Sequence, residues 1–257
     1  MLDLSVCVAC ATTAVVFMGS AWVLSLRLRD ASIADVVWGS MLAAIAALAY
    51  LIGERPERSL LLAVLVGLWG IRLAAHIGAR NLGHGEDRRY AAFRERDGAS
   101  FRMRSLWSIF GIQAGLGWIV ALPVQSAAAD AKPQGIGAVA LGGALVALIG
   151  LAYETAADLQ LRRFLARGAS GVMDQGLWRF SRHPNYFGDA VFWWGVWLVA
   201  LEAGSPVWTA VGPLVMTVIL LKVSGVSLLE QTISDRRPAY REYAQRTNAF
   251  IPGRSRS

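Results

Sequence analysis

The chain has 257 residues, a 55% share of hydrophobic residues and a mean hydropathy of +0.45. It is too apolar for an ordinary soluble domain, so we predict a single integral membrane domain over residues 1–257. The net charge of +7 does not indicate nucleic-acid binding, because arginines in short loops mainly set membrane topology.

Seven apolar stretches predict an all-α protein with seven transmembrane helices. A helix that crosses a membrane needs about 20 mostly apolar residues, and the sixth stretch is short and aromatic. In chain order the predicted spans are 4–26, 33–52, 60–79, 106–126, 136–159, 186–203 and 207–227.

The basic residues predict the orientation of these spans. Most of the 25 lysines and arginines lie in the loops after the first, third, fifth and seventh spans. Basic loops stay in the cytoplasm, so we expect the N-terminus outside and the C-terminus in the cytoplasm. Residues 86–104 are expected to form an amphipathic helix at the membrane surface, and 235–246 a short helix near the C-terminus.

The first span and its two cysteines have simple interpretations. The chain begins Met-Leu-Asp without a cationic stretch, which favours a first span over a cleaved signal. Cys7 and Cys10 have no further ligands nearby, so we expect neither a metal site nor a disulfide.

Several charged side chains fall inside the predicted spans, where an unpaired charge costs about 3 kcal/mol or more. On the third and fifth spans these residues recur every four positions, which places each set on one helix face. Either they pair with each other or they line a cavity open to the cytosol. The residues concerned are Asp35, with Trp38 close by, Arg72, His76, Arg80, Glu154, Asp158, Arg162 and Lys222, followed by Glu230.

The segment 176–189 is a polar, cationic stretch placed directly before the sixth span. Arginine side chains match phosphate oxygens in bidentate geometry, and a ligand with several phosphates would use them. S-adenosylmethionine has none. The arginines expected near this end of the bundle are Arg80, Arg88, Arg89, Arg162, Arg163, Arg179 and Arg182.

Four motifs of the sequence belong together. They are Arg182-His183-Pro184-Asn185-Tyr186, Asp35-Val36-Val37-Trp38-Gly39, Gly85-Glu86-Asp87-Arg88-Arg89-Tyr90 and the ending Tyr240-Arg241-Glu242-Tyr243 with Ile251-Pro252. As a set they resemble the bacterial DUF1295 family, a branch of the steroid 5-alpha-reductase superfamily, over roughly 33–252. The Arg182–Tyr186 motif is also shared with isoprenylcysteine carboxyl methyltransferases.

The resemblance implies a reductase of the bacterial inner membrane that uses NADPH from the cytosol. It would reduce a carbon–carbon double bond conjugated to a carbonyl in a lipid-like substrate, with an acid group donating a proton. No metal is expected, and nothing in the sequence indicates an oligomeric state. The residues expected to bind NADPH are Arg72, Arg80, Glu154, Asp158, Arg162, Arg179, Arg182, His183, Asn185, Tyr186, Glu230 and Tyr243.

The catalytic residues depart from the pattern of the steroid enzymes. Asp35 falls near their second-helix glutamate, and Trp69 stands where their catalytic tyrosine is expected. A tryptophan has no phenolic proton to donate, so His76 is the candidate proton donor, with an ordinary pKa near 6.5. We expect Asp35 and His76 to be catalytic and Trp38 and Trp69 to face the substrate.

Two other functions remain open from the sequence. A membrane methyltransferase acting on a lipid or prenyl-cysteine would bind S-adenosylmethionine and be indifferent to NADPH. A non-enzymatic scaffold or small transporter would use the converging charges as an internal network of ion pairs.

Overall fold

The structure is a computed structural model that describes residues 2–54, 57–81, 83, 85–129, 135–168, 171–223 and 239–254. Within these ranges all the regular structure is helical, which confirms the predicted all-α class. The chain forms two compact units, each built from two stretches. Unit 1 comprises Met1–Leu141 and Val199–Gly212, and unit 2 comprises Gly142–Leu198 and Pro213–Ser257.

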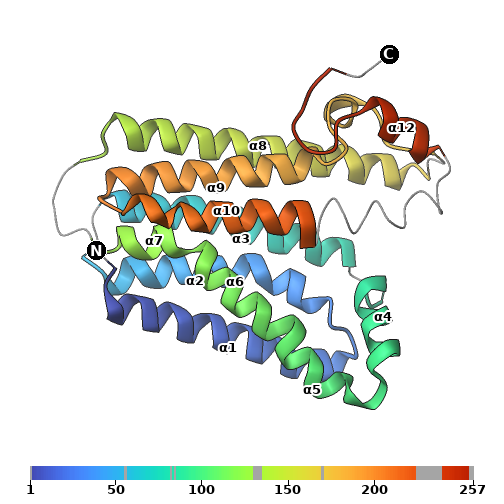
Figure 1. Ribbon diagram of the computed structural model, residues 1–257, viewed down its shortest axis with the longest axis horizontal. Helices are drawn as coiled ribbons and strands as arrows, with labels where there is room; N and C mark the ends of the chain where they lie inside the picture. Colours follow the sequence, from blue (N-terminus) through green and yellow to red (C-terminus); the bar gives the residue numbers. More distant parts are fainter. Residues whose placement is uncertain are drawn as a thin grey trace. The chain divides into compact units, whose positions relative to one another are not determined.

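Unit 1 contains three long helices: α1 (Leu4–Leu28), α2 (Ile33–Ile52) and α3 (Glu57–Asn81). Helix α2 packs against both of the others, as Figure 1 shows. Asp3 caps the start of α1, because its carboxylate accepts the backbone N–H of Ser5 at 2.7 Å. The helix ends at Arg29, whose φ of 55° is left-handed and cannot continue it.

Two glycines allow α2 and α3 to approach closely. A Cβ at Gly39 would overlap the carbonyl oxygen of Gly70, and a Cβ at Gly70 would overlap that of Gly39. Small residues at a crossing let two helix backbones meet, which is how helices associate in membranes. This contact sets the distance between the helix that carries Asp35 and the helix that carries His76.

The rest of unit 1 is a series of shorter helices (Figure 1). The predicted surface helix is two helices, α4 (Arg88–Asp97) and α5 (Phe101–Ser105), which are separated by the 3-10 turn Gly98–Ser100. Gly98 has a φ of +53°, and this turn ends α4. The predicted fourth span is divided into a π-helical turn η2 (Leu106–Gly111), α6 (Ile112–Val120) and α7 (Leu122–Ala127).

A buried ion pair joins distant stretches of unit 1. Arg58 is only 4% exposed and donates to the carbonyl oxygens of Glu202 at 3.0 Å and Gly135 at 2.9 Å. Its Nε lies 3.7 Å from the Glu202 carboxylate. That carboxylate also accepts the backbone N–H groups of Gly137 and Ala140, so it caps the start of α8 (Ala138–Ala166).

Unit 2 takes most of α8, of α9 (Pro184–Glu202) and of α10 (Val211–Val218), together with the π-helical turn η5 (Ile219–Val223) and α12 (Tyr240–Arg246). Helix α12 confirms the described part of the predicted C-terminal helix. The short 3-10 turn η3 (Gly176–Arg179) precedes α9.

Helices α8 and α9 cross through glycines on both sides. A Cβ at Gly150 would lie 2.5 Å from the backbone nitrogen of Phe192. A Cβ at Gly188 would lie 2.6 Å from the backbone nitrogen of Glu154 and 2.7 Å from the carbonyl oxygen of Gly150. Since these contacts are with backbone atoms, no side chain can move aside to make room.

Four of the described helices are long and apolar enough to cross a membrane, as an integral membrane protein requires. They are α1, α2, α3 and α8 and correspond to the first, second, third and fifth predicted spans. The stretch predicted as the fourth span is interrupted, and α9, which covers the predicted sixth span, is not one of these four helices. The predicted seventh span corresponds to a shorter apolar helix over Val207–Lys222. Residues 224–227 of the seventh prediction lie outside the described residues.

Candidate functional site

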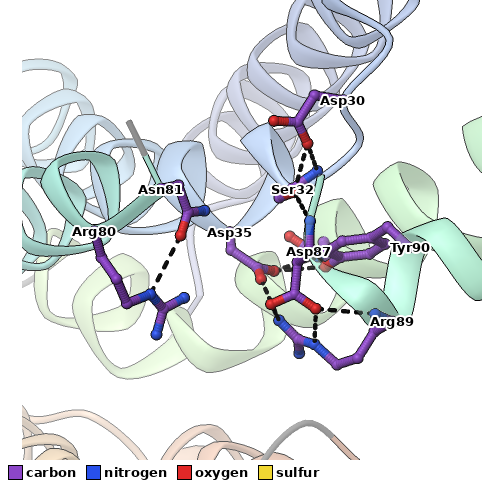
Figure 2. A network of polar contacts seen from close by, with 9 residues as sticks. Asp30, Ser32, Asp35, Arg80, Asn81, Asp87, Arg89 and Tyr90 are labelled. Carbon is purple, nitrogen blue, oxygen red and sulfur yellow. Dashed lines mark hydrogen bonds and ion pairs between the residues drawn. The ribbon is translucent and has the colours of Figure 1, made fainter. Parts of the chain in front are cut away.

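Asp35, in the first turn of α2, gathers hydrogen-bond donors from two other elements (Figure 2). Its Oδ1 accepts the Tyr90 hydroxyl at 2.6 Å, and its Oδ2 accepts the Arg89 guanidinium at 2.7 Å. Gln113 of α6 approaches the same carboxylate, with Nε2 3.5 Å from Oδ1. We call Asp35, Arg89, Tyr90 and Gln113 the Asp35 cluster.

Arg89 links two carboxylates. Its Nε donates to Asp87 at 3.0 Å, while the same guanidinium reaches Asp35 through Nη2. The ion pair is partly shielded, with side chains 25% exposed for Arg89 and 20% for Asp35. An arginine that already serves two carboxylates has little capacity left for a phosphate group.

The segment that carries Arg89 and Tyr90 is fixed to the loop between α1 and α2, as Figure 2 shows in part. The backbone N–H of Asp87 donates to the Ser32 hydroxyl at 2.8 Å, and the N–H of Ala31 donates to Glu86 at 2.7 Å. Arg94 holds the same Glu86 carboxylate through two bonds of 2.8 Å. These contacts position the start of α4 over Asp35.

The phenol of Tyr90 is held in its protonated form. Burial and the neighbouring Asp35 carboxylate raise the pKa of Tyr90 well above its usual value. Its single hydroxyl hydrogen is already donated to Asp35. Toward any further group, the Tyr90 hydroxyl oxygen can therefore only accept a hydrogen bond.

A fall in pH should weaken the contacts that fix the start of α4 to the loop between α1 and α2. Burial alone would raise the pKa of Glu86 and Asp87, but hydrogen bonds from Arg94 and Arg89 outweigh it and hold both below the usual values of 4.5 and 3.8. A depressed carboxyl pKa stabilises the fold above the unfolded value, and this stability is lost as pH falls through the folded value.

We therefore expect the thermal midpoint in detergent to fall as pH drops from 5 to 3. Glu86→Gln should show a shallower fall, since it has no proton to take up there. Glu95→Gln is the matched control, because Glu95 lies exposed on α4. Parallel acid profiles for the wild type and Glu86→Gln would contradict this assignment.

Helix α3 carries Trp69, Arg72, His76 and Arg80 at the predicted spacing. Trp69 is fully buried, Arg72 and His76 are half-buried, and Arg80 is exposed and donates to Asn81 at 3.2 Å. Asp35 pairs with Arg89, Tyr90 and Gln113 rather than with Trp69 or His76. Trp38 is half-buried one turn after Asp35, beside Gly117 of α6.

Unit 2 holds a second polar cluster, formed by Glu154, Asp158 and Asn185. Asn185, in the first turn of α9, donates its amide to Asp158 of α8 at 3.1 Å. Glu154 and Asp158 are 3% and 6% exposed. Asn185 Oδ1 is buried and accepts no hydrogen bond from the described residues. We call these three residues the Asp158 cluster.

The glycine crossing of α8 and α9 determines the position of the Asp158 cluster. Gly188 lies three residues after Asn185, and its neighbour Glu154 lies four residues before Asp158. The Asp158–Asn185 bond therefore forms one helical turn from the point of closest backbone approach.

The loop before α9 is anchored to the C-terminal segment. Arg182 donates to the carbonyl oxygens of Ala244 and Thr247, and Tyr243 donates its hydroxyl to the carbonyl oxygens of Trp178 and Ser181. These two predicted cofactor ligands thus have structural contacts inside unit 2. Their proposed contact with a cofactor stays a prediction.

The other predicted cofactor residues of unit 2 are placed as follows. The rings of His183 and Tyr186 are stacked, with centroids 5.5 Å apart. Arg162 and Arg179 are exposed and remain accessible to an anion. Glu230 lies outside the described residues. Asp35 pairs with Arg89, which was not among the intramembrane charges considered as its partners from the sequence.

The model of one protein family, described as "Protein of unknown function (DUF1295)", matches residues 21–247. The chain belongs to the DUF1295 family. This match confirms the family to which the sequence motifs pointed. No curated protein and no solved structure matches the chain.

Two residues that the sequence did not mark as functional, Tyr90 and Gln113, complete the Asp35 cluster of this DUF1295 protein. Arg89 was expected among the arginines that suit phosphates, and it bonds Asp35 and Asp87 instead. Tyr90 belongs to one of the family-like motifs, and Gln113, a polar residue in an apolar span, was a signal in itself. Gly150 and Gly188 could not be singled out, because glycines are frequent throughout the predicted spans.

Proposed function

We propose that this DUF1295 protein is an NADPH-dependent membrane oxidoreductase related to the steroid 5-alpha-reductases. It would reduce a carbon–carbon double bond conjugated to a carbonyl in a lipid-like substrate. The observation that carries this proposal is the Asp158 cluster, where an acceptor carboxylate and an unsatisfied amide oxygen lie together.

The donor and acceptor groups of the cluster suit a nucleotide. The Asp158 carboxylate can accept hydrogen bonds from ribose hydroxyls, as acidic residues do in other dinucleotide sites. A buried acceptor without a donor costs about 1–3 kcal/mol, so Asn185 Oδ1 favours a ligand that brings an N–H or O–H group.

Exposed arginines near these residues suit phosphates. Arg162 lies one turn beyond Asp158 on α8, and Arg163 and Arg179 are also exposed. Arginine is preferred for phosphate because its planar donors can bind two oxygens at once. S-adenosylmethionine has no phosphate that would use them.

NADPH would supply the hydride, and a residue of this chain would supply the proton. The oxygens of Asp35 already accept three donors, which makes Asp35 a poor source of a proton. Among the predicted catalytic residues this leaves His76, since an imidazole is the side chain that most often acts as a general acid or base.

The proposal includes the predicted topology of seven spans with the C-terminus in the cytoplasm of a bacterium. The basic residues in the loops predicted to be cytoplasmic support this topology, because basic loops stay in the cytoplasm. Under this topology NADPH reaches the protein from the cytosol, and the substrate arrives from the bilayer.

Titration calorimetry in nanodiscs tests the cofactor directly. We expect the wild type to bind NADPH, and Asn185→Ala and Asp158→Asn to weaken binding about tenfold or more, since each removes a buried hydrogen-bonding group. Gln245→Ala, on an exposed amide of α12, is the matched control and should leave the affinity unchanged.

Two outcomes would contradict the proposal. Binding of S-adenosylmethionine without NADPH would favour a membrane methyltransferase. No binding of either compound would favour a non-enzymatic membrane protein. Lipid analysis of a deletion strain gives a second readout, because substrate and product of the proposed reaction differ by two hydrogens.

A further inference from the structure

The amide of Gln113 has a fixed orientation in the Asp35 cluster. Its Nε2 lies 3.3 Å from the Tyr90 hydroxyl oxygen and 3.5 Å from the Asp35 carboxylate. A carboxylate only accepts hydrogen bonds, so the NH₂ end of the amide has to face it. The carbonyl end of Gln113 is thereby turned away from Asp35.

That carbonyl oxygen, Gln113 Oε1, is buried and accepts no hydrogen bond from the described residues. A buried acceptor in this state costs about 1–3 kcal/mol relative to one with a donor. Such groups in native proteins usually receive a water or a ligand. A ligand that donates one hydrogen bond would therefore satisfy Gln113 Oε1.

The local helix geometry determines where Gln113 lies. Gln113 lies two residues after the π-helical turn η2, which interrupts the α-helical register over Leu106–Gly111. One added residue rotates the following side chains by about 100° around the helix axis. Turns of this kind are found mostly at functional sites.

The groups of the Asp35 cluster define the chemistry of a matching ligand. Tyr90 has committed its hydrogen to Asp35, and Arg89 donates to both Asp35 and Asp87. The unsatisfied group is a neutral acceptor, so a hydroxyl fits it and a carbonyl oxygen does not. The 20% exposure of the Asp35 side chain leaves the cluster within reach from outside.

We propose that Gln113 Oε1 accepts a hydrogen bond from a hydroxyl group of a lipid, so that the substrate is a lipid alcohol. Calling this lipid the substrate rests on the proposed function, and the hydroxyl is then separate from the carbonyl that reacts. The source is a lipid because Gln113 belongs to an apolar stretch, flanked by Ile112 and Ala114.

Binding of a matched pair of probes, 2-tridecanol and 2-tridecanone, tests the inference without NADPH. The two compounds differ only in whether the oxygen carries a hydrogen. In nanodiscs, we expect the wild type to bind the alcohol about tenfold more tightly than the ketone, the value of one net hydrogen bond.

Gln113→Met removes the acceptor while keeping the length of the side chain, and the preference should disappear. A wild type that binds the ketone as tightly as the alcohol would overturn the proposal and indicate that water occupies the position. So would a Gln113→Met protein that keeps the preference. If the preference is present and NADPH does not bind, the proposed function fails and the hydroxyl site stands.

Discussion

Replacing Gly188 with alanine is expected to destabilise unit 2 and to abolish the binding of NADPH. A Cβ at this position would lie 2.6 Å and 2.7 Å from backbone atoms of α8, so the two helices have to move apart. Overpacking of this kind costs about 1–3 kcal/mol. The Asp158–Asn185 bond, one turn away, would then lose its 3.1 Å geometry.

The matched control for Gly188→Ala is Gly142→Ala on α8, where an added Cβ meets nothing within 4 Å. Alanine is favoured over glycine inside a helix by about 0.5–1 kcal/mol, so this variant should be as stable as the wild type or more so. Thermal unfolding in detergent and NADPH calorimetry measure both effects. A Gly188→Ala protein that unfolds with the wild type would show that the helices do not need this contact.

Replacing Arg58 with alanine is expected to destabilise unit 1 by about 3 kcal/mol, because breaking a buried ion pair leaves the other charge in place. The carbonyl oxygens of Gly135 and Glu202 lose their donor at the same time. Glu202 still accepts the backbone N–H of Gly137, which limits the loss. For a chain of this size, the thermal midpoint should fall by about 6–10 °C.

Arg104→Ala is the control for the Arg58 prediction. Its ion pair with Asp97 has a distance of 3.2 Å, but the Arg104 side chain is 64% exposed. Exposed ion pairs contribute about 0–1 kcal/mol, so the midpoint should hardly change. Equal losses in the two variants would mean that burial does not determine the contribution of Arg58.

Long apolar stretches made the helices predictable. Spans one, two and three were found at nearly the observed bounds, and the fifth began correctly but ended short of Ala166, where α8 ends. A helix of about 20 apolar residues has few other interpretations. The fourth stretch was harder, since the π-helical turn at Leu106–Gly111 and the break before Pro123 depend on packing rather than on composition. The break at Gly98 in the surface helix depends in the same way on one residue with positive φ.

The polar residues of the site were predictable as a set, and their pairings were not. Asp35 was identified because a charge inside a span is costly. Its partners Arg89 and Gln113 come from segments that are 54 and 78 positions away in the sequence. Helical spacing relates residues within one helix only, so it could not show that α4 lies over Asp35.

The ion pair of Arg58 with Glu202 has a consequence for biosynthesis. The two residues are 144 positions apart, and Glu202 is the last residue of α9. At about 5–20 residues per second, a ribosome needs roughly 7–30 seconds to translate that interval. Throughout this time the first three helices exist in the cell without the residue that completes their unit. Assembly of the N-terminal half therefore waits for translation of the C-terminal half, and a truncated chain would leave a membrane segment with an uncompensated charge.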